Sequence, residues 1–156
     1  MNAAEDSYVM ALKRSATAVW NGTGPKGNGK LTTLSGAFKD QPYSANARFQ
    51  SEDGKAGTNP EELIAAAHGG CFTMALAFGI TNAGHEPTEL KTEAVVSMEK
   101  QDIGWTITSI HLDVEGKVPG VTAEKFAELA ENAKKGCPIS RALAGNNITM
   151  SAKLLS

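Results

Sequence analysis

The chain has 156 residues, a formal net charge of −2 and 41% hydrophobic residues, which suffices for one globular domain with one core over residues 1–156. The near balance of charge gives no electrostatic basis for binding nucleic acid or an anionic membrane. Residues 1–6 lack a basic segment followed by an apolar run, so we expect no signal peptide and a cytoplasmic location.

The number of cysteines limits the roles that the thiols can have. The chain has two cysteines, Cys71 and Cys137. Structural disulfides are uncommon in cytoplasmic proteins of this size, so the two thiols are expected to be free, metal-binding or redox-active.

Three strands are predicted in the first third of the chain, at residues 16–20, 31–34 and 43–49. The glycine-rich residues 21–30 match most of a phosphate-binding loop, but Leu31 stands where that motif needs Ser or Thr. A hairpin loop is therefore the better interpretation. Arg48 falls on the third predicted strand among small and apolar neighbours, where a solvated strand arginine is the structural alternative to a functional one.

Residues 58–80 predict the long helix around which the chain is organised. Asn59 suits the N-cap and Pro60 the first helical position, and Glu61 and Glu62 complement the helix dipole. The remainder is apolar nearly all round, with Cys71 at its centre, so the helix must be buried. Its length is borderline for a membrane span, but it has internal glycines and a histidine and no cationic or aromatic flanks, which argues against one.

The second half of the chain alternates between strands and helices. A hairpin of strands 91–100 and 105–115 is predicted, with a bulge near Ser109 where the alternation slips. A helix capped by Thr122 and a short helix after Cys137 follow, and residues 147–154 form a last strand. This order predicts an α+β fold. Six strands and one amphipathic helix are too few to cover the central helix on every side, which suggests that a dimer supplies the rest.

The environments predicted for the two thiols differ. Cys137 lies in the first turn of a helix, where backbone N–H groups favour the thiolate. Cys71 lies inside a helix, so a reactive Cys71 needs a cation, for which Arg48 is the candidate. Glu61 or Glu62 would then hold that arginine in a bidentate pair.

Other interpretations of these residues stay open at this point. Cys71 is also consistent with simple core packing. His68 and Cys71, spaced i and i+3, together with Cys137 would make three ligands for a metal ion, although no paired Cys or His motif supports this. An acyl-transfer site that uses Cys71 and a histidine has no positive support in the sequence. The neighbouring Gly69 and Gly70 suggest that a crossing helix or a substrate approaches the backbone closely.

Three segments together resemble one known family. Residues 58–72 are similar to the nucleophile segment of the OsmC/Ohr family, the osmotically inducible protein C and organic hydroperoxide resistance proteins. Residues 41–49 resemble its arginine-bearing strand, more closely that of the OsmC branch, and residues 135–140 resemble its resolving-cysteine segment. The order and spacing agree over nearly the whole chain. One departure is the pair Gly69 and Gly70, where relatives often carry alanine.

The resemblance implies a fold and an activity. The fold is OsmC-like, with antiparallel sheets around a long buried central helix, in an intertwined homodimer with active sites at the subunit interface. The activity is a thiol peroxidase of oxidative and osmotic stress that reduces organic hydroperoxides to alcohols. Cys71 is then the peroxidatic cysteine, Cys137 the resolving cysteine that forms a disulfide with it, Arg48 the activating cation and Glu61 the carboxylate that orients Arg48.

The resemblance also implies no metal and no bound organic cofactor. The reductant is an external dithiol, such as protein-bound dihydrolipoamide. An apolar lining that includes Ala67 and Phe72 is expected to favour alkyl hydroperoxides over hydrogen peroxide. A hypothesis of a different class is a non-enzymatic stress-response dimer that binds an apolar ligand, with Cys71 as core filling.

Overall fold

The computed structural model describes residues 10–156, which form two compact units, residues 10–59 and Pro60–Ser156. Residues 1–6, for which the sequence predicts no signal peptide, lie outside the described residues. The assignment of residues 1–156 to a single domain stays a prediction.

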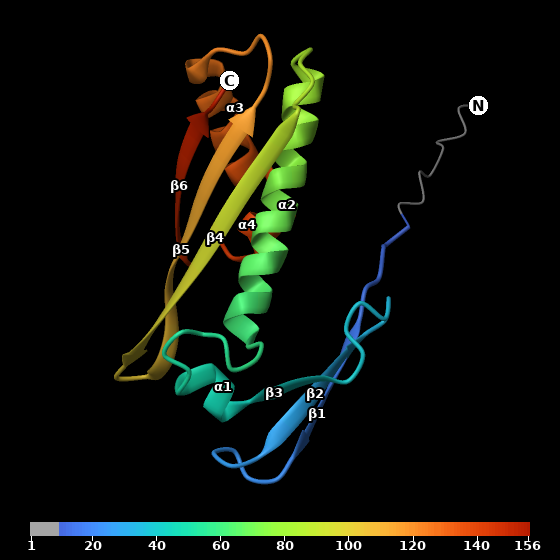
Figure 1. Ribbon diagram of the computed structural model, residues 1–156, viewed down its shortest axis with the longest axis vertical. Coiled ribbons are helices and arrows are strands. Elements are labelled where there is room, and N and C mark those ends of the chain that lie inside the picture. The colour runs from blue at the N-terminus through green and yellow to red at the C-terminus, as the bar shows by residue number, and fades with distance from the viewer. Residues whose placement is uncertain (1–9) are drawn as a thin grey trace, which may run out of the picture. The chain divides into compact units, whose positions relative to one another are not determined.

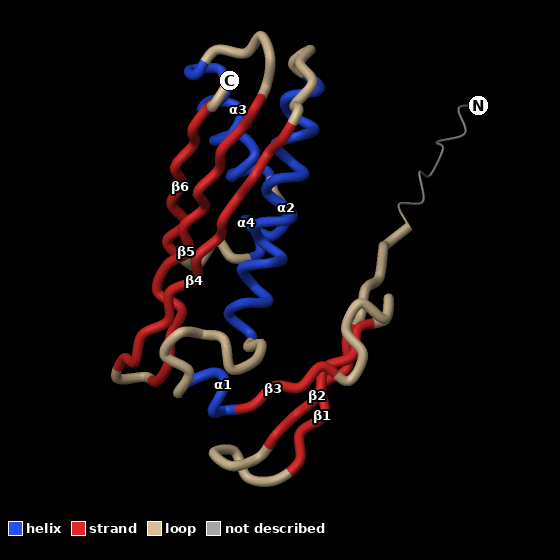
Figure 2. The backbone as a smooth tube through the Cα atoms, in the orientation of Figure 1, coloured by secondary structure: helices blue, strands red, loops and turns tan. Residues whose placement is uncertain are grey.

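The first unit contains a three-stranded antiparallel sheet in the order β1 (Ala16–Asn21), β2 (Asn28–Thr33), β3 (Gln41–Ser44) (Figures 1 and 2). The glycine-rich segment is the β1–β2 hairpin, as predicted. On the central strand, Gly29 pairs with both Trp20 and Tyr43, whose ring centroids are 5.4 Å apart. A Cβ atom at Gly29 would collide with the Tyr43 ring, so these rings require a glycine there.

The prediction of one strand over residues 43–49 is wrong in its second half. The chain turns after Ser44 into the helix α1 (Ala45–Phe49), because the Ser44 Oγ accepts a hydrogen bond of 3.1 Å from the N–H of Ala47 and caps the helix. Arg48 is therefore a helical residue. Its guanidinium lies over the Phe49 ring, 4.9 Å from the centroid.

The second unit begins with the long helix α2 (Pro60–Asn82), followed by the hairpin of β4 (Glu89–Gln101) and β5 (Gly104–Lys117) (Figure 1). The hairpin register shifts where Ser97 pairs with Ser109 but Met98 pairs with Ile107, so β5 has one extra residue. The bulge predicted near Ser109 is confirmed.

Two helices and a last strand complete the second unit: α3 (Ala123–Gly136), α4 (Pro138–Ala142) and β6 (Asn147–Leu154). The sheet order is β4-β5-β6, and β6 runs parallel to β5. The expectation of antiparallel pairing throughout therefore fails for this strand pair. The chain returns to the sheet through α3 and α4, and a crossover of this kind brings a strand back parallel.

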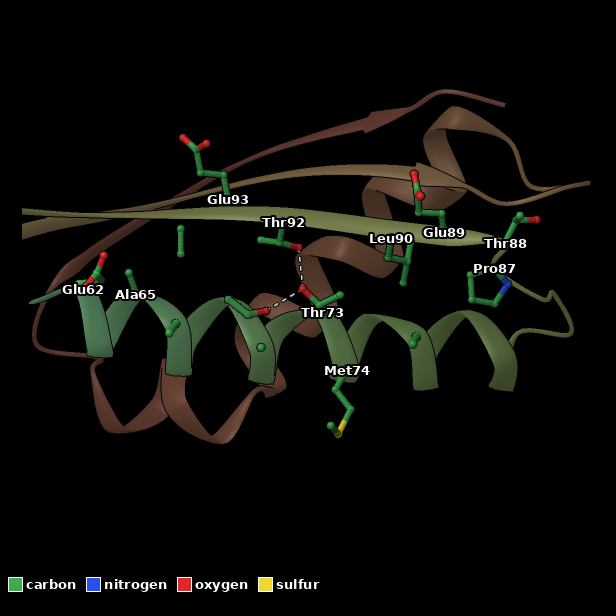
Figure 3. Close-up of a pocket in the computed structure, with 15 residues that line it drawn as sticks. Glu62, Ala65, Thr73, Met74, Pro87, Thr88, Glu89, Leu90, Thr92 and Glu93 are labelled. Atoms are coloured by element: carbon green, nitrogen blue, oxygen red, sulfur yellow. Dashed lines mark hydrogen bonds between the residues drawn. The ribbon is translucent and has the colours of Figure 1, made fainter. Parts of the chain in front are cut away.

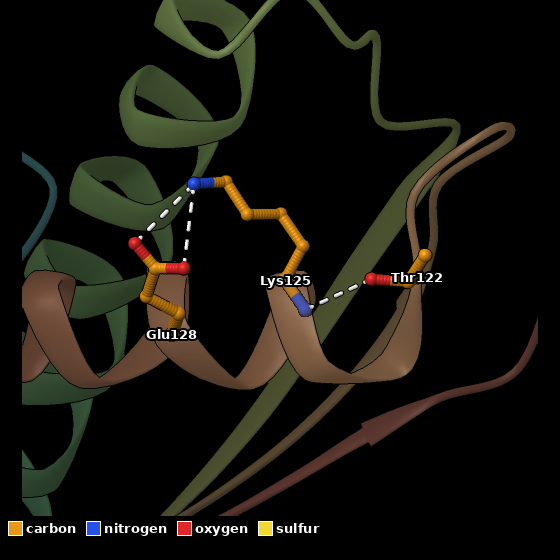
Figure 4. Close-up of polar contacts among 3 residues, drawn as sticks. All are labelled: Thr122, Lys125 and Glu128. Atoms are coloured by element: carbon orange, nitrogen blue, oxygen red, sulfur yellow. Dashed lines mark hydrogen bonds and ion pairs between the residues drawn. The ribbon is translucent and has the colours of Figure 1, made fainter.

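Helix α3 begins where a side chain caps its first turn. The Thr122 Oγ1 accepts a 3.1 Å hydrogen bond from the N–H of Lys125, as its predicted cap role requires (Figure 4). The Lys125 Nζ lies 3.3 Å from the Glu128 carboxylate one turn later. The buried face of α3 packs into the core with α2.

The core lies between the sheet and the helices α2 and α3. On α2 the buried stripe is formed by residues at every fourth position: His68, Phe72, Leu76 and Ile80. The opposite stripe, which we call the outer stripe, is exposed in the single chain and consists of Glu62, Ala66, Gly70, Met74 and Phe78. The prediction of a helix buried all round therefore holds for one face only within one chain.

Among the described residues, α2 is the helix with the length and composition to cross a membrane. Core helices of globular proteins share these properties, and α2 packs its buried stripe against the sheet and α3 of its own unit.

Candidate active site

The central feature of the second unit is a contact between its two thiols. The Sγ atoms of Cys71 and Cys137 lie 2.8 Å apart and share a hydrogen bond, and both cysteines are free. A disulfide needs a separation of about 2.05 Å, so a sulfur movement of less than about 1 Å would join them. The two sulfurs are therefore within reach of a disulfide bond.

The local structure of Cys137 follows from its place in the sequence. It is the N-cap of α4, with Pro138 at the first helical position. Its Sγ takes the place of a capping oxygen and accepts a hydrogen bond of 3.5 Å from the N–H of Ser140. The predicted location in a helix start is confirmed.

The two thiols differ in exposure. Cys137 is 0% exposed and belongs to the apolar core, whereas Cys71 is half-buried. A small oxidant arriving from solvent therefore meets Cys71 first. Cys137 is shielded from solvent and contacts Cys71.

The electrostatics of the pair are also unequal. Burial, followed by the hydrogen bond with Cys137, raises the pKa of the Cys71 thiol, although the nearby Arg141 acts in the opposite direction. Burial alone would raise the pKa of Cys137 as well. The hydrogen bond shared with Cys71 and the effects of the backbone and side chain of Ser140 outweigh it, so that the pKa of Cys137 is lowered. Within this unit the thiolate therefore forms more readily at Cys137.

A buried histidine adjoins the thiol pair. His68 is fully buried one turn before Cys71, and its Nε2 lies 2.7 Å from the Ser140 Oγ. Burial lowers the pKa of His68, so its imidazole is neutral at physiological pH. Its Nδ1 has no hydrogen-bond partner among the described residues.

The other two predicted site residues, Arg48 and Glu61, precede both cysteines in the sequence. Arg48 belongs to the first unit, so its role at the thiol pair stays a prediction. Glu61, in the first turn of α2, is only 9% exposed, whereas its neighbour Glu62 is exposed. A buried carboxylate requires a charged or hydrogen-bonding partner, which favours Glu61 over Glu62 for a structural ion pair.

The predicted close approach at the glycine pair is not found among residues 10–156. A Cβ atom on Gly69 would lie 3.5 Å from the Cβ of Ala94, an ordinary contact, and Gly70 faces open space. Both line a groove of about 820 Å³ between α2 and β4. Figure 3 shows Thr73 at its centre, bonded to Thr92 on the strand, with Met74 pointing away from β4.

The hypothesis of a metal site gains no support from the geometry. Within residues 10–156, no group of three or more His, Cys, Asp or Glu side chains is placed to hold a metal ion. The His68 Nε2 is directed at Ser140, as described above.

Two contributors to the site were missed in the sequence. Ser140 contacts both His68 and Cys137, and Arg141 acts electrostatically on Cys71. The hydroxyl and the cation follow Cys137 within the short helix α4, where a capped helix places side chains beside the cap. That pattern was available as a signal.

The protein therefore has an α+β fold with two free cysteines in contact, one of them on the long helix α2. These features place it among small proteins with a dithiol site. The chain belongs to the OsmC-like protein family, whose profile matches residues 52–153. The α+β fold with a long central helix, predicted from the sequence, is confirmed by solved structures of this type. The organic hydroperoxide resistance protein OhrB of Bacillus subtilis matches 90% of this chain and 97% of its own, with 29% identity and a TM-score of 0.66.

A second structure and two sequences extend the comparison. An organic hydroperoxide resistance protein from Elizabethkingia anophelis is 26% identical, with a TM-score of 0.72, and the match covers 94% of this chain and 97% of that one. The Escherichia coli K12 protein named Peroxiredoxin OsmC is 44% identical over 147 residues, 94% of this chain and 100% of its own length. Bacillus subtilis OhrB is 31% identical over 76% of this chain and 83% of its own.

Proposed function

We propose that this protein is a thiol-dependent peroxidase that reduces organic hydroperoxides to alcohols. The observation that carries the proposal is the 2.8 Å contact between a half-buried thiol, Cys71, and a fully buried one, Cys137. The names of the relatives, a peroxiredoxin and organic hydroperoxide resistance proteins, point to the same chemistry. A stress-protective role follows from that activity.

Cys71 carries out the first step. Its thiolate attacks the distal oxygen of the hydroperoxide, the O–O bond breaks, and the alkoxide leaves and takes up a proton to become the alcohol. The sulfur is oxidised to a sulfenic acid and the peroxide is reduced. The half-buried position of Cys71 suits this role, since the oxidant must reach the sulfur.

The raised pKa of Cys71 means that this step needs a cation. Arg141 supplies part of the field, and we assign the larger part to Arg48, whose guanidinium would also stabilise the charge that develops on the departing oxygen. The buried carboxylate of Glu61 is the residue proposed to orient Arg48.

Cys137 carries out the second step. Its sulfur attacks the sulfenic sulfur of Cys71, the S–O bond breaks, and water leaves as the intrachain disulfide forms. Because Cys137 is already in contact with Cys71, the disulfide forms before a second peroxide oxidises the sulfenic acid further. An external dithiol then exchanges with this disulfide, becomes oxidised and restores both thiols.

The proposed cycle uses these side chains and an external reductant such as protein-bound dihydrolipoamide. It requires no metal or bound organic cofactor, and a cytoplasmic location suits it, since free thiols persist in a reducing compartment.

The lining of the substrate channel needs one correction. Phe72 is 0% exposed and fills the core, so it does not line a channel open to solvent. Ala67, one turn before Cys71, is exposed and remains a candidate. We propose that apolar residues on this side of α2 favour alkyl over hydrogen peroxide.

We further propose that the protein works as a homodimer in which a second copy covers the outer stripe of α2. Met74 is 63% exposed and Phe78 is 65% exposed in the single chain, on a stripe that also bounds the groove beside β4. A stripe of this kind on a small protein marks an interface. The second copy would supply the cover that the sequence predicts for the central helix.

The experiment is a turnover assay with cumene hydroperoxide, dihydrolipoamide as reductant, and the Cys71→Ser variant as control. The proposal predicts dihydrolipoamide-dependent loss of hydroperoxide by the wild type and none by the variant. Equal rates for the two proteins would overturn it. Equal efficiency with hydrogen peroxide would overturn the substrate preference alone.

The groove between α2 and β4 favours one alternative, a non-enzymatic dimer that binds an apolar ligand. It predicts that Cys71→Ser retains all function and that a hydrophobic dye binds the wild type with a stoichiometry that oxidation does not change. The turnover assay distinguishes the two.

A further inference from the structure

Two polar side chains, those of His68 and Ser140, lie next to the thiol pair and have no role in the proposed peroxidase cycle. Fully buried polar groups are costly unless they are hydrogen-bonded. His68, with no exposed surface, nevertheless lies in the apolar core on α2, and the Ser140 hydroxyl of α4 lies 2.7 Å from its Nε2. His68 and Ser140 are 72 residues apart in the sequence, and they form this contact next to Cys137.

Ser140 connects this histidine to the sulfur. Its backbone N–H donates a 3.5 Å hydrogen bond to the Sγ of Cys137, and its hydroxyl helps to lower the pKa of that thiol. The result is a continuous chain of contacts from His68 through Ser140 and Cys137 to Cys71.

The direction of the hydrogen bonds in this chain follows from the burial of His68. The neutral imidazole carries one N–H. If that proton is on Nε2, it is donated to the Ser140 oxygen, and the Ser140 O–H is free to donate to the sulfur of Cys137. Nδ1 is then a bare lone pair. The opposite tautomer would bury an Nδ1–H without an acceptor among the described residues and would use the Ser140 proton on His68.

We propose that His68 and Ser140 are positioning residues that hold Cys137 as a thiolate ready for the resolving step. The proposal rests on the proposed peroxidase function for its biological meaning. The Cys137 proton has gone to solvent beforehand; the thiolate then attacks the Cys71 sulfenic sulfur, and the leaving hydroxide takes up one proton from solvent to become water. His68 and Ser140 change no oxidation state in this step.

Other titratable and charged groups near Cys137 also affect its ionisation, so a test must leave them unmutated as far as possible. Cys71 faces it from α2, and Arg141 lies on its own helix. Lys134 and Lys135 in the last turn of α3 line a pocket of about 410 Å³ together with Ser140. All are left unchanged in the variants below except Cys71, which is replaced in every one of the titrated proteins.

The first test is a thiolate titration followed by ultraviolet absorbance in the Cys71→Ser background, where Cys137 is the remaining thiol. Absorbance needs no reagent to reach the buried sulfur. Adding Ser140→Ala should move the titration to higher pH, and Ser140→Thr, which keeps the hydroxyl, should restore it. His68→Leu should act like Ser140→Ala, whereas His68→Gln, which retains an N–H donor, should act like wild type.

The second test measures the resolving step itself with Cys71 present. A dimedone trap followed by mass spectrometry gives the lifetime of the Cys71 sulfenic acid after a hydroperoxide pulse. Ser140→Ala should lengthen that lifetime about tenfold while leaving the rate of sulfenic acid formation unchanged, because a hydrogen bond to a charged sulfur is lost. Ser140→Thr should restore the shorter lifetime.

The outcomes separate this proposal from the peroxidase proposal. An unchanged titration in both Ser140→Ala and His68→Leu overturns the positioning role, whatever the peroxidase activity. A shifted titration in a protein whose Cys71 does not react with hydroperoxide supports the positioning role and overturns the peroxidase instead.

Discussion

The Sγ atoms of Cys71 and Cys137 lie 2.8 Å apart although 66 residues separate the two cysteines in the chain. The first is carried by the middle of α2 and the second by the cap of α4, so the packing of these two helices sets the distance. In the proposed cycle the two sulfurs react one after the other, because Cys137 already lies beside Cys71 when Cys71 is oxidised.

The proposed activating role of Arg48 predicts a large kinetic effect. Arg48→Met should lower the rate constant for reaction with cumene hydroperoxide about a hundredfold, since the thiolate and the developing oxyanion lose their cation. Stopped-flow oxidation of the reduced protein gives this rate constant directly.

The matched control is Arg141→Met, which removes the cation already seen to act on Cys71. Because Arg141 is exposed, we expect a loss of only about threefold. If Arg141→Met were the more damaging change, the activating role would belong to Arg141 and the assignment of Arg48 would be wrong.

Burial of His68 predicts how stability depends on pH. Its folded-state pKa lies below the ordinary value of 6.5, so below pH 6.5 the unfolded chain binds a proton that the folded chain does not. The free energy of unfolding should therefore fall as the pH drops below 6.5, until the folded-state pKa is reached. Urea unfolding at several pH values measures this slope. His68→Gln should have a shallower slope, and an identical slope in both proteins would contradict the account.

The outer stripe of α2 predicts the effect of a charge on assembly. Met74→Lys should weaken self-association about tenfold or more, because it would bury an unpaired ammonium between two copies. Sedimentation velocity over a range of concentrations measures this. Ile103→Lys is the control, since Ile103 is 88% exposed in the β4–β5 turn and should leave the association unchanged. A monomeric wild type would contradict the proposal outright.

The space at Gly69 predicts that an alanine is tolerated. Gly69→Ala should raise the free energy of unfolding by about 0.5–1 kcal/mol, because alanine is the better helix former and its Cβ finds an ordinary contact with Ala94. Chemical denaturation measures the change. A loss of stability would show that something approaches this backbone more closely than Ala94 does.

Most of the second unit was predictable because its patterns are local. The cap at Thr122, the proline at the first position of α4 and the alternation along β6 each depend on a few neighbouring residues, and all were placed correctly. The slip of parity before Ser109 likewise located the bulge. Periodicity says nothing about strand direction, however, so the parallel pairing of β6 was missed.

Other features could not be predicted from local patterns. They depend either on competition between helix and strand or on contacts between residues far apart in the sequence. The alternation after Tyr43 favoured a strand, but the Ser44 side chain caps the following turn and the helix prevailed over residues 45–49. The contact between His68 and Ser140 joins two helices, and no pattern within either one signals it. The pairing of the thiols was implied by the family resemblance and not by their spacing.

The most direct test of the central claim is the state of each cysteine after one equivalent of cumene hydroperoxide, determined by mass spectrometry for the wild type and Cys137→Ser. The account predicts a Cys71–Cys137 disulfide in the wild type and a sulfenic acid on Cys71 in the variant. If both thiols of the wild type stay reduced, the peroxidase account is wrong and the family likeness describes the fold alone.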